Sequence, residues 1–441
     1  MLEVTNIRNG AILNHARGTE TGDYLEIKVE GIADPQAIVK VNGADVERAD
    51  RFFSAPVRLT QKINEIVVSA DSSFGEQQLR LTVLWDKKSF KRYNYYIDDC
   101  SFFYTDIAKQ RPKSLFDHFF LKRLKEIHDR YGTKITLNSF YRNDHFPFEL
   151  KDFPDVYKQE WIANSDWLRL SFHAYSEFPD RPYQRTAPEK LAEDFDLLKR
   201  EIIRFAGEET FIAPVVIHWA MANPEVFALL KQRGMNMING SFIGSKTYVG
   251  EMDHAVRVCD IGYFYEKDVA LYIEKYKNYY DKFTGMILNT GAGATANLYP
   301  VEVLTQKIMA AANSPYYNET IGMATHEQYS FEYYFNYIPD HLDRIEACCR
   351  LVSELRGAAV HDHGVLAGGG ADRPRLEHGR SRKAVFSRLI QPPCLFLLCF
   401  IVCIGNFLCT MQKVGKQVLS VTINSINVNS NKEEESCRST Q

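Results

Sequence analysis

Between residues 93 and 356 the sequence alternates short apolar segments with amphipathic ones, and this alternation constrains the fold more than any other feature. The apolar segments have the length of buried strands, and the segments between them carry apolar residues at helical spacing. Repeated strand–helix units favour a parallel sheet, and this many units in one domain favour a β/α barrel or a long open sheet. In both architectures the chemistry lies at the C-terminal ends of the strands. The predicted strands are Tyr95–Ile97, Lys134–Phe140, Trp167–Phe172, Phe211–Ile217, Gly285–Leu288 and Glu319–Ala324, and the predicted helices span 114–131, 187–205, 224–233, 299–312 and 339–355.

The first 90 residues have a different pattern. The segment 24–30 alternates apolar and polar residues, which is typical of a half-buried strand, and Asn42-Gly43 is a hairpin turn signal. Further short strands follow at close spacing, and no helical periodicity interrupts them. We therefore expect an all-β sandwich over 1–90 and an α/β domain over 91–356.

The last 85 residues, 357–441, change composition again. A basic stretch at 373–388 precedes the segment 389–412, which carries no charged residue. About 20 apolar residues span a bilayer, so 389–412 is either a transmembrane anchor or part of a non-native tail. The basic flank would keep the main domains of an anchored chain cytoplasmic. The start, Met1-Leu2-Glu3-Val4, lacks the features of a signal peptide, so we expect a cytoplasmic or C-terminally anchored protein.

Composition excludes some functions and favours others. Of 441 residues, 53 are Lys or Arg and 56 are Asp or Glu, so the net charge of −3 provides no global field to attract nucleic acid. Aromatic residues make up 13% of the chain, and such rings pack well against the apolar faces of sugars. The cysteines of the first 356 residues show no C-x-x-C spacing, which argues against a zinc ribbon or a disulfide framework.

Four predicted strands end in polar residues that suit one site. The first ends in Asp98-Asp99, and the later ones end in His173, His218 and His326. Two adjacent carboxylates after an apolar strand are costly unless they are solvated, paired or bound to a metal. A single histidine at a strand end is usually a structural residue, but four such endings on one rim predict a shared site. Glu177, four residues after His173, could close on the same cation.

With these endings, residues 93–356 resemble the polysaccharide deacetylase (NodB-homology) family. The resemblance implies a distorted β/α barrel, a divalent transition metal (zinc, manganese or iron) and hydrolysis of an acetyl amide or ester on a sugar by a metal-activated water. It implies that Asp98 is the general base, that Asp99, His173 and Glu177 bind the metal, and that His326 is the general acid. The substrate would be an acetylated oligo- or polysaccharide, with a cell-envelope glycan as a plausible source.

The N-terminal part carries a second resemblance. Its segment Val41-Asn42-Gly43, followed by Phe53, Leu59 and Asn64-Glu65-Ile66, is similar to the Ig-like modules attached to bacterial glycan enzymes. Such modules usually position or bind, and they seldom catalyse.

The sequence also departs from the deacetylase pattern. Glu177 stands where the family has a second histidine, and the segment 212–218 lacks the Arg and the Pro-Tyr pair of the third motif. No counterpart of the Asp-Trp motif can be placed. His218 could be a third nitrogen ligand or a substrate contact, and we assign His218, Trp219, Tyr175 and Tyr183 to substrate binding.

Two alternatives remain open. A glycoside hydrolase would use Asp98 and Glu177 as paired carboxylates and would work without metal. A non-catalytic glycan-binding protein on a degenerate barrel would keep its sugar affinity after loss of Asp98. The interpretation we favour is a metal-dependent carbohydrate deacetylase.

Overall fold

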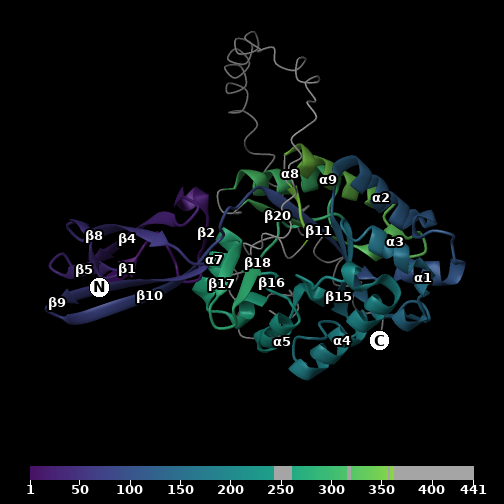
Figure 1. Ribbon diagram of the computed structural model, residues 1–441, viewed down its shortest axis with the longest axis horizontal. Coiled ribbons are helices and arrows are strands. Elements are labelled where there is room, and N and C mark those ends of the chain that lie inside the picture. Colours follow the sequence, from purple (N-terminus) through teal and green to yellow (C-terminus); the bar gives the residue numbers. More distant parts are fainter. Residues whose placement is uncertain (243–260, 315–318, 356–357, 362–441) are drawn as a thin grey trace, which may run out of the picture. The chain divides into compact units, whose positions relative to one another are not determined.

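The computed structural model describes residues 1–242, 261–314, 319–355 and 358–361 (Figure 1). In this part of the chain, no helix combines the length and the apolar character needed to cross a membrane. The segment 389–412, for which we expect an anchor or a non-native tail, lies outside the described residues.

Residues 1–85 form two five-stranded sheets that bury one apolar core between them. Strand β4 shows why: its residues alternate between buried and more exposed positions, and Leu25 and Val29 are fully buried. The strands expected here are present, whereas an Ig-like arrangement stays a prediction. One sheet contains β1(Leu2–Val4), β3(Gly18–Glu20), β4(Leu25–Ala33), β7(Glu47–Ala49) and β8(Phe52–Leu59), and the other contains β2(Ile12–Leu13), β5(Ile38–Val41), β6(Ala44–Asp45), β9(Ile63–Ser72) and β10(Gly75–Trp85).

The rest of the described chain is α/β. Its main sheet has the order β15-β12-β11-β20-β19, with β21 also paired to β11, and all its pairs are parallel. A second sheet has the order β16-β18-β17. These strands are β11(Arg92–Cys100), β12(Ile135–Phe140), β15(Leu168–Ala174), β16(Met237–Asn239), β17(Asn278–Asp281), β18(Met286–Asn289), β19(Ala294–Thr295), β20(Thr320–His326) and β21(Ala358–Ala359), and a separate small hairpin pairs β13(Arg142–Asn143) with β14(Phe148–Glu149).

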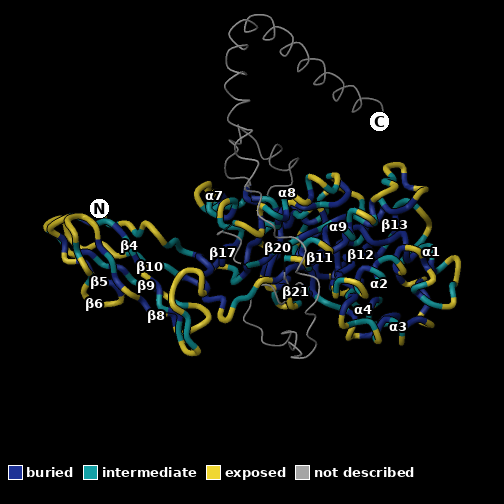
Figure 2. Tube along the Cα trace, turned by 90° about the horizontal axis from the view of Figure 1, so that it is seen from above, coloured by how far each residue is buried: buried dark blue, intermediate teal, exposed yellow. Residues whose placement is uncertain are grey.

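Helices cover the main sheet, with α8 beside α9 and α9 beside α2 (Figure 1). Strand β11 is buried over its whole length, as expected for a parallel strand covered on both faces, and it lies among the dark blue segments of Figure 2. The α-helices are α1(Phe102–Gln110), α2(Phe119–Tyr131), α3(Lys158–Ala163), α4(Pro188–Ala206), α5(Phe227–Gln232), α7(Lys267–Tyr276), α8(Val301–Asn313) and α9(His341–Glu354). Short 3-10 helices are η1(His15–Arg17), η2(Leu115–Asp117), η3(Leu150–Asp152), η4(Asp155–Tyr157), η5(Glu208–Thr210), η6(His218–Ala220), η7(Pro224–Val226), η8(Ile261–Phe264) and η9(Glu327–Ser330).

The predicted strand Phe211–Ile217 does not form as a regular strand. It makes one bridge, between Phe211 and Leu170, and single backbone hydrogen bonds at Ile212 and Val215. Pro214 has no N–H to donate, so it interrupts the ladder at this point. The architecture is thus mixed α/β with several sheets, and closure of the main sheet into a barrel stays a prediction.

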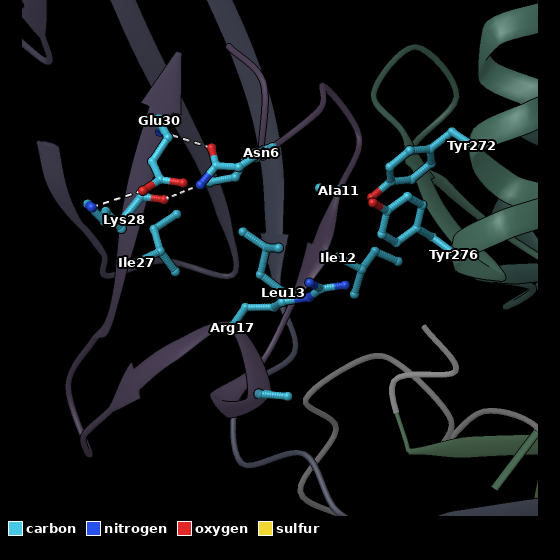
Figure 3. Close-up of a pocket in the computed structure, with 12 residues that line it drawn as sticks. Asn6, Ala11, Ile12, Leu13, Arg17, Ile27, Lys28, Glu30, Tyr272 and Tyr276 are labelled. Atoms are coloured by element: carbon cyan, nitrogen blue, oxygen red, sulfur yellow. Dashed lines mark hydrogen bonds and ion pairs between the residues drawn. The ribbon is translucent and has the colours of Figure 1, made fainter. Parts of the chain in front are cut away.

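A cavity of about 300 Å³ lies between the first two sheets and α7 (Figure 3). Tyr272 and Tyr276 stack along one wall with ring centroids 4.4 Å apart, and the Arg17 guanidinium lies 5.7 Å from the Tyr276 ring. Gly10 allows its backbone to lie close to the Tyr279 ring, because a Cβ at this position would lie 2.2 Å from that ring.

Candidate metal centre

The last residues of β11 include the carboxylates Asp98 and Asp99, which lie near the C-terminal ends of the neighbouring strands. The register with β12 shifts between Ile97 and Cys100, and Asp99 has a left-handed backbone with φ of 61°. This conformation costs about 1–2 kcal/mol for most residues and less for Asp. Such local strain is typical of functional sites. Asp98 pairs in register with His326 and accepts a hydrogen bond of 2.7 Å from Asn138 Nδ2.

Asp99, His173 and His218 form a compact buried group. Asp99 Oδ1 lies 3.2 Å from His173 Nε2 and 3.3 Å from His218 Nδ1, and the two nitrogens are 3.2 Å apart. None of the three residues is more than 7% exposed. Among the described residues this is the group of His, Cys, Asp and Glu side chains close enough to hold one metal ion.

A hydrogen bond to His218 and a charged neighbour beside His173 orient the two histidines. His218 Nε2 lies 3.0 Å from the backbone oxygen of Glu177, so this nitrogen donates and Nδ1 turns its lone pair toward Asp99. His173 Nδ1 lies 3.7 Å from Asp98 Oδ1, which favours the proton on Nδ1 and leaves Nε2 as the acceptor. Metal-binding histidines characteristically direct their second nitrogen at a carbonyl or carboxylate in this way.

The three converging atoms fit a divalent transition metal. Bonds of about 2.0–2.2 Å to nitrogen and oxygen place neighbouring ligand atoms about 3.0–3.5 Å apart in tetrahedral or octahedral geometry. The separations of 3.2–3.3 Å fall in this range. Two imidazole nitrogens and a carboxylate suit zinc, manganese or iron. Asp99, His173 and His218 could therefore hold the metal that the sequence predicts.

The electrostatics of the group favour cation binding. Burial raises the pKa of Asp99, but the attraction of His326, His173 and His218 outweighs it and holds the pKa well below its usual range. Burial lowers the pKa of His173 to about 4, so the imidazole is neutral near pH 7 and its lone pair is free to bind a metal.

His326, the expected general acid, is oriented by a residue that the sequence did not reveal. Its Nδ1 lies 3.0 Å from Asn297 Oδ1, which can only accept, so Nδ1 carries the proton there. Thr325 Oγ1 donates to the same oxygen and also contacts His341. Burial lowers the pKa of His326. Asn297 lies two residues after β19, in a segment that no sequence motif marked.

Glu177 is placed differently from its expected role as a ligand. Its carboxylate lies 2.6 Å from His145 Nε2 and accepts a hydrogen bond from Gln328, and it is not part of the Asp99–His173–His218 group. Burial first, and the charge of Asp99 second, raise its pKa. In the structure His218 thus completes the group that we expected Glu177 to complete, and metal binding by Glu177 stays a prediction. His145 carried no sequence signal.

The residues expected to bind substrate differ in exposure. Trp219 is 37% exposed, and the Arg181 guanidinium lies 4.4 Å from its ring centre. Tyr175 is partly buried and stacks on Tyr141. Tyr183 is only 1% exposed, so its ring is enclosed by protein in this structure, and substrate binding by Tyr183 stays a prediction.

Glu327 anchors the turn that follows Asp98 and Asp99. Its carboxylate is fully buried and accepts backbone hydrogen bonds from Ser101, Phe102 and Phe103, at 2.7, 3.0 and 2.6 Å. Burial raises its pKa, and the three N–H donors oppose that shift. Because Glu327 directly follows His326, one side chain ties the end of β20 to the start of α1.

Comparison with known proteins identifies no family. No family model matches the chain. No curated protein matches it. Among solved structures, the chain is similar to Agd3, described as a novel carbohydrate deacetylase, with a TM-score of 0.33 and 8% identity over 78% of this chain and 69% of that one. It is also similar to a GH5 xyloglucanase of Bacteroides ovatus, with a TM-score of 0.29 and 11% identity over 80% of this chain and all of that one. Likeness at this level transfers neither fold nor activity, so the functional argument rests on the residues of this chain.

Proposed function

We propose that this chain is a metal-dependent hydrolase that removes acetyl groups from a carbohydrate. The observation that carries the proposal is the buried Asp99–His173–His218 group with a carboxylate and a histidine beside it. Asp98 and His326 are register partners at the ends of neighbouring parallel strands, so an acid and a base lie at the same rim as the metal group.

Asp98 suits the role of general base. Its Oδ1 accepts a hydrogen bond from Asn138 and faces His173 Nδ1, which fixes the carboxylate next to the metal group. From there it can take a proton from the attacking water. A divalent cation bound to the group would polarise the acetyl carbonyl and acidify that water.

His326 suits the role of general acid. Asn297 holds the proton of Nδ1, so Nε2 is the nitrogen left to exchange a proton with substrate. Once Nε2 has taken up a proton, the imidazolium would protonate the amine or alkoxide that leaves when the acetyl group is cleaved. Its position one residue before Glu327 keeps it at a fixed place relative to Asp98.

The glycoside hydrolase alternative also has an observation in its favour. Burial raises the pKa of Glu177, as a general acid in a glycosidase requires. That mechanism would pair Glu177 with Asp98 and would need no metal. The two functions are therefore separated by metal dependence.

The test begins with metal content of the full chain, measured by mass spectrometry after purification without chelators. We expect about one transition metal per chain in the wild type, less than a tenth of that in His173→Ala and in His218→Ala, and an unchanged content in Glu177→Gln. Loss of metal in Glu177→Gln and His173→Ala, with an unchanged content in His218→Ala, would instead support the ligand set Asp99, His173 and Glu177 that the family resemblance implies.

Activity is then measured as acetate released from acetylated hexasaccharides, with and without a chelator. Chelation should abolish release, and the metal found in the protein should restore it. Cleavage of glycosidic bonds that persists in chelator would support the glycoside hydrolase and contradict the deacetylase. Sugar binding that survives Asp98→Asn with no acetate release in the wild type would support a binding protein.

A further inference from the structure

A second cavity lies beside the segment that follows His326. It has a volume of about 370 Å³ and is lined by residues of α1, by the start of α2 and by the segment from Ser330 to Leu342. None of its lining residues belongs to the metal group or to the substrate contacts that the sequence predicts. Its volume is in the range of small-ligand sites.

Aromatic rings form part of its walls. Phe119 is 44% exposed and Tyr333 is 50% exposed. Tyr333 stacks on Phe102 with centroids 5.6 Å apart and meets Phe146 edge-on at 5.3 Å, so its ring is held in place while half of it stays accessible. An accessible aromatic face attracts the apolar face of a sugar and also a cation.

The charges along these walls have one sign. Asp106 and Glu332 line the cavity, and none of the described residues lining it is Lys or Arg. Asp106 also hydrogen-bonds with Tyr333, and its Oδ2 lies 3.5 Å from His118 Nε2, behind the cavity lining. His341 also lines it, but burial lowers its pKa to about 3, so it adds no positive charge near pH 7. The cavity of Figure 3 differs, because Arg17 and Lys28 line it together with Glu30.

We propose that this second cavity binds the protonated amino group of an amino-sugar unit, with the sugar ring against Tyr333 and the ammonium near Asp106 and Glu332. Aromatic faces combined with carboxylates are the chemistry that recognises an ammonium group on an apolar ring. The choice of an amino sugar rests on the proposed function, because N-deacetylation of a glycan leaves a primary amine that is protonated at neutral pH. The occupant is then a unit that has already lost its acetyl group.

The position of the cavity connects it with the metal group. The segment Glu327–Ile338 starts directly after His326, and the Tyr329 ring lies 6.3 Å from the His326 ring. Tyr329 contacts Tyr334, which is adjacent to Tyr333 in the cavity wall. A glycan chain with one unit at the metal group could place another of its units in this cavity. The enzyme would then prefer chains that already carry free amines.

The test measures binding by calorimetry at pH 7 and low salt, with two probes: a glucosamine tetramer and its fully N-acetylated form. The full chain carries His173→Ala, so that no acetyl group is removed during titration. We expect tighter binding of the glucosamine tetramer, with a loss of about fivefold in Glu332→Gln and of about tenfold in Tyr333→Ala. Binding of the acetylated tetramer should change less than twofold in Glu332→Gln.

Glu193→Gln is the matched control, since Glu193 is an exposed acid on α4, which contributes no residue to the cavity. It should leave both affinities unchanged. Equal affinity of the wild-type cavity for the two tetramers, or equal losses in the Glu193 and Glu332 variants, would overturn the inference. Acetate release without amine preference would leave the proposed function standing and remove only the inference. Amine binding in a protein that releases no acetate would contradict the proposed function and leave the amine site in this cavity standing.

Discussion

Ionisable side chains are exposed on the sheets of residues 1–85 and buried at the strand ends around Asp99. On the sheets, Arg80 and Glu65 form an ion pair at 2.7 Å with both side chains more than half exposed. At the strand ends, Asp99 and His173 lie 3.2 Å apart and are almost completely buried. Water screens the first pair, so it contributes little, whereas the second pair has lost its water and depends on its neighbours or on a cation. The difference is therefore one of burial: the carboxylate and histidines of the proposed metal group have lost their water, whereas the exposed pair on the sheet has kept it.

Asp99→Asn should have the largest effect and would test the buried side of this comparison. The amide removes the anionic ligand, so metal affinity should fall at least about 100-fold and acetate release should be lost. Saturating metal should raise the Tm of the wild type and leave the Tm of the variant unchanged, because only a ligand that binds the folded state stabilises it. Differential scanning calorimetry with and without metal measures this. Equal Tm shifts in both proteins would show that the cation binds elsewhere.

Asn297→Ala tests the orientation of His326 and should have the next largest effect. Without the Asn297 oxygen, His326 loses the partner of Nδ1 and can adopt the wrong tautomer. We expect kcat for acetate release to fall about 10- to 100-fold, with KM and metal content nearly unchanged. A purely structural role would change KM or metal content as well. An unchanged kcat would remove His326 from the proposed mechanism.

Glu327→Ala tests, through the stability of the protein, how strongly Glu327 ties the end of β20 to the start of α1. Three backbone N–H groups lose their buried acceptor, so the free energy of unfolding should fall by about 2 kcal/mol or more. Urea denaturation of the metal-free protein measures this without the contribution of a bound cation. A loss of unfolding free energy below about 0.5 kcal/mol would mean that the turn after Asp99 keeps its conformation without the Glu327 carboxylate.

Arg80→Ala should have the smallest effect and serves as the contrast. Its pair with Glu65 is exposed on a sheet of residues 1–85, so the free energy of unfolding should change by less than about 0.5 kcal/mol. Metal content and acetate release should equal those of the wild type. A clear loss of metal content or of acetate release would show that the sheets of residues 1–85 support the metal group. It would contradict the contrast that we draw between the two regions.

Much of the site could be predicted from periodicity alone. The apolar segments before Asp98, His173 and His326 have the length and composition of buried strands, and parallel strands end at one edge. This is enough to predict that those residues meet. Strand Phe211–Ile217 was predicted by the same rule and did not form regularly, yet His218 still reaches the group. The chain turns directly after His218, with positive φ at Trp219 and Ala220.

Local residue order was enough to predict that acidic and histidine side chains meet at one rim of a parallel sheet, because strand period and apolar length depend only on it. The three-dimensional arrangement was needed to see that His218 completes the group with Asp99 and His173, that Asn297 orients His326, and that Tyr183 is enclosed. These outcomes depend on side-chain directions and on segments far apart in sequence. A hydrogen bond or a shared ligand position depends on a few tenths of an ångström in space, and the spacing of residues along the chain does not specify distances that finely.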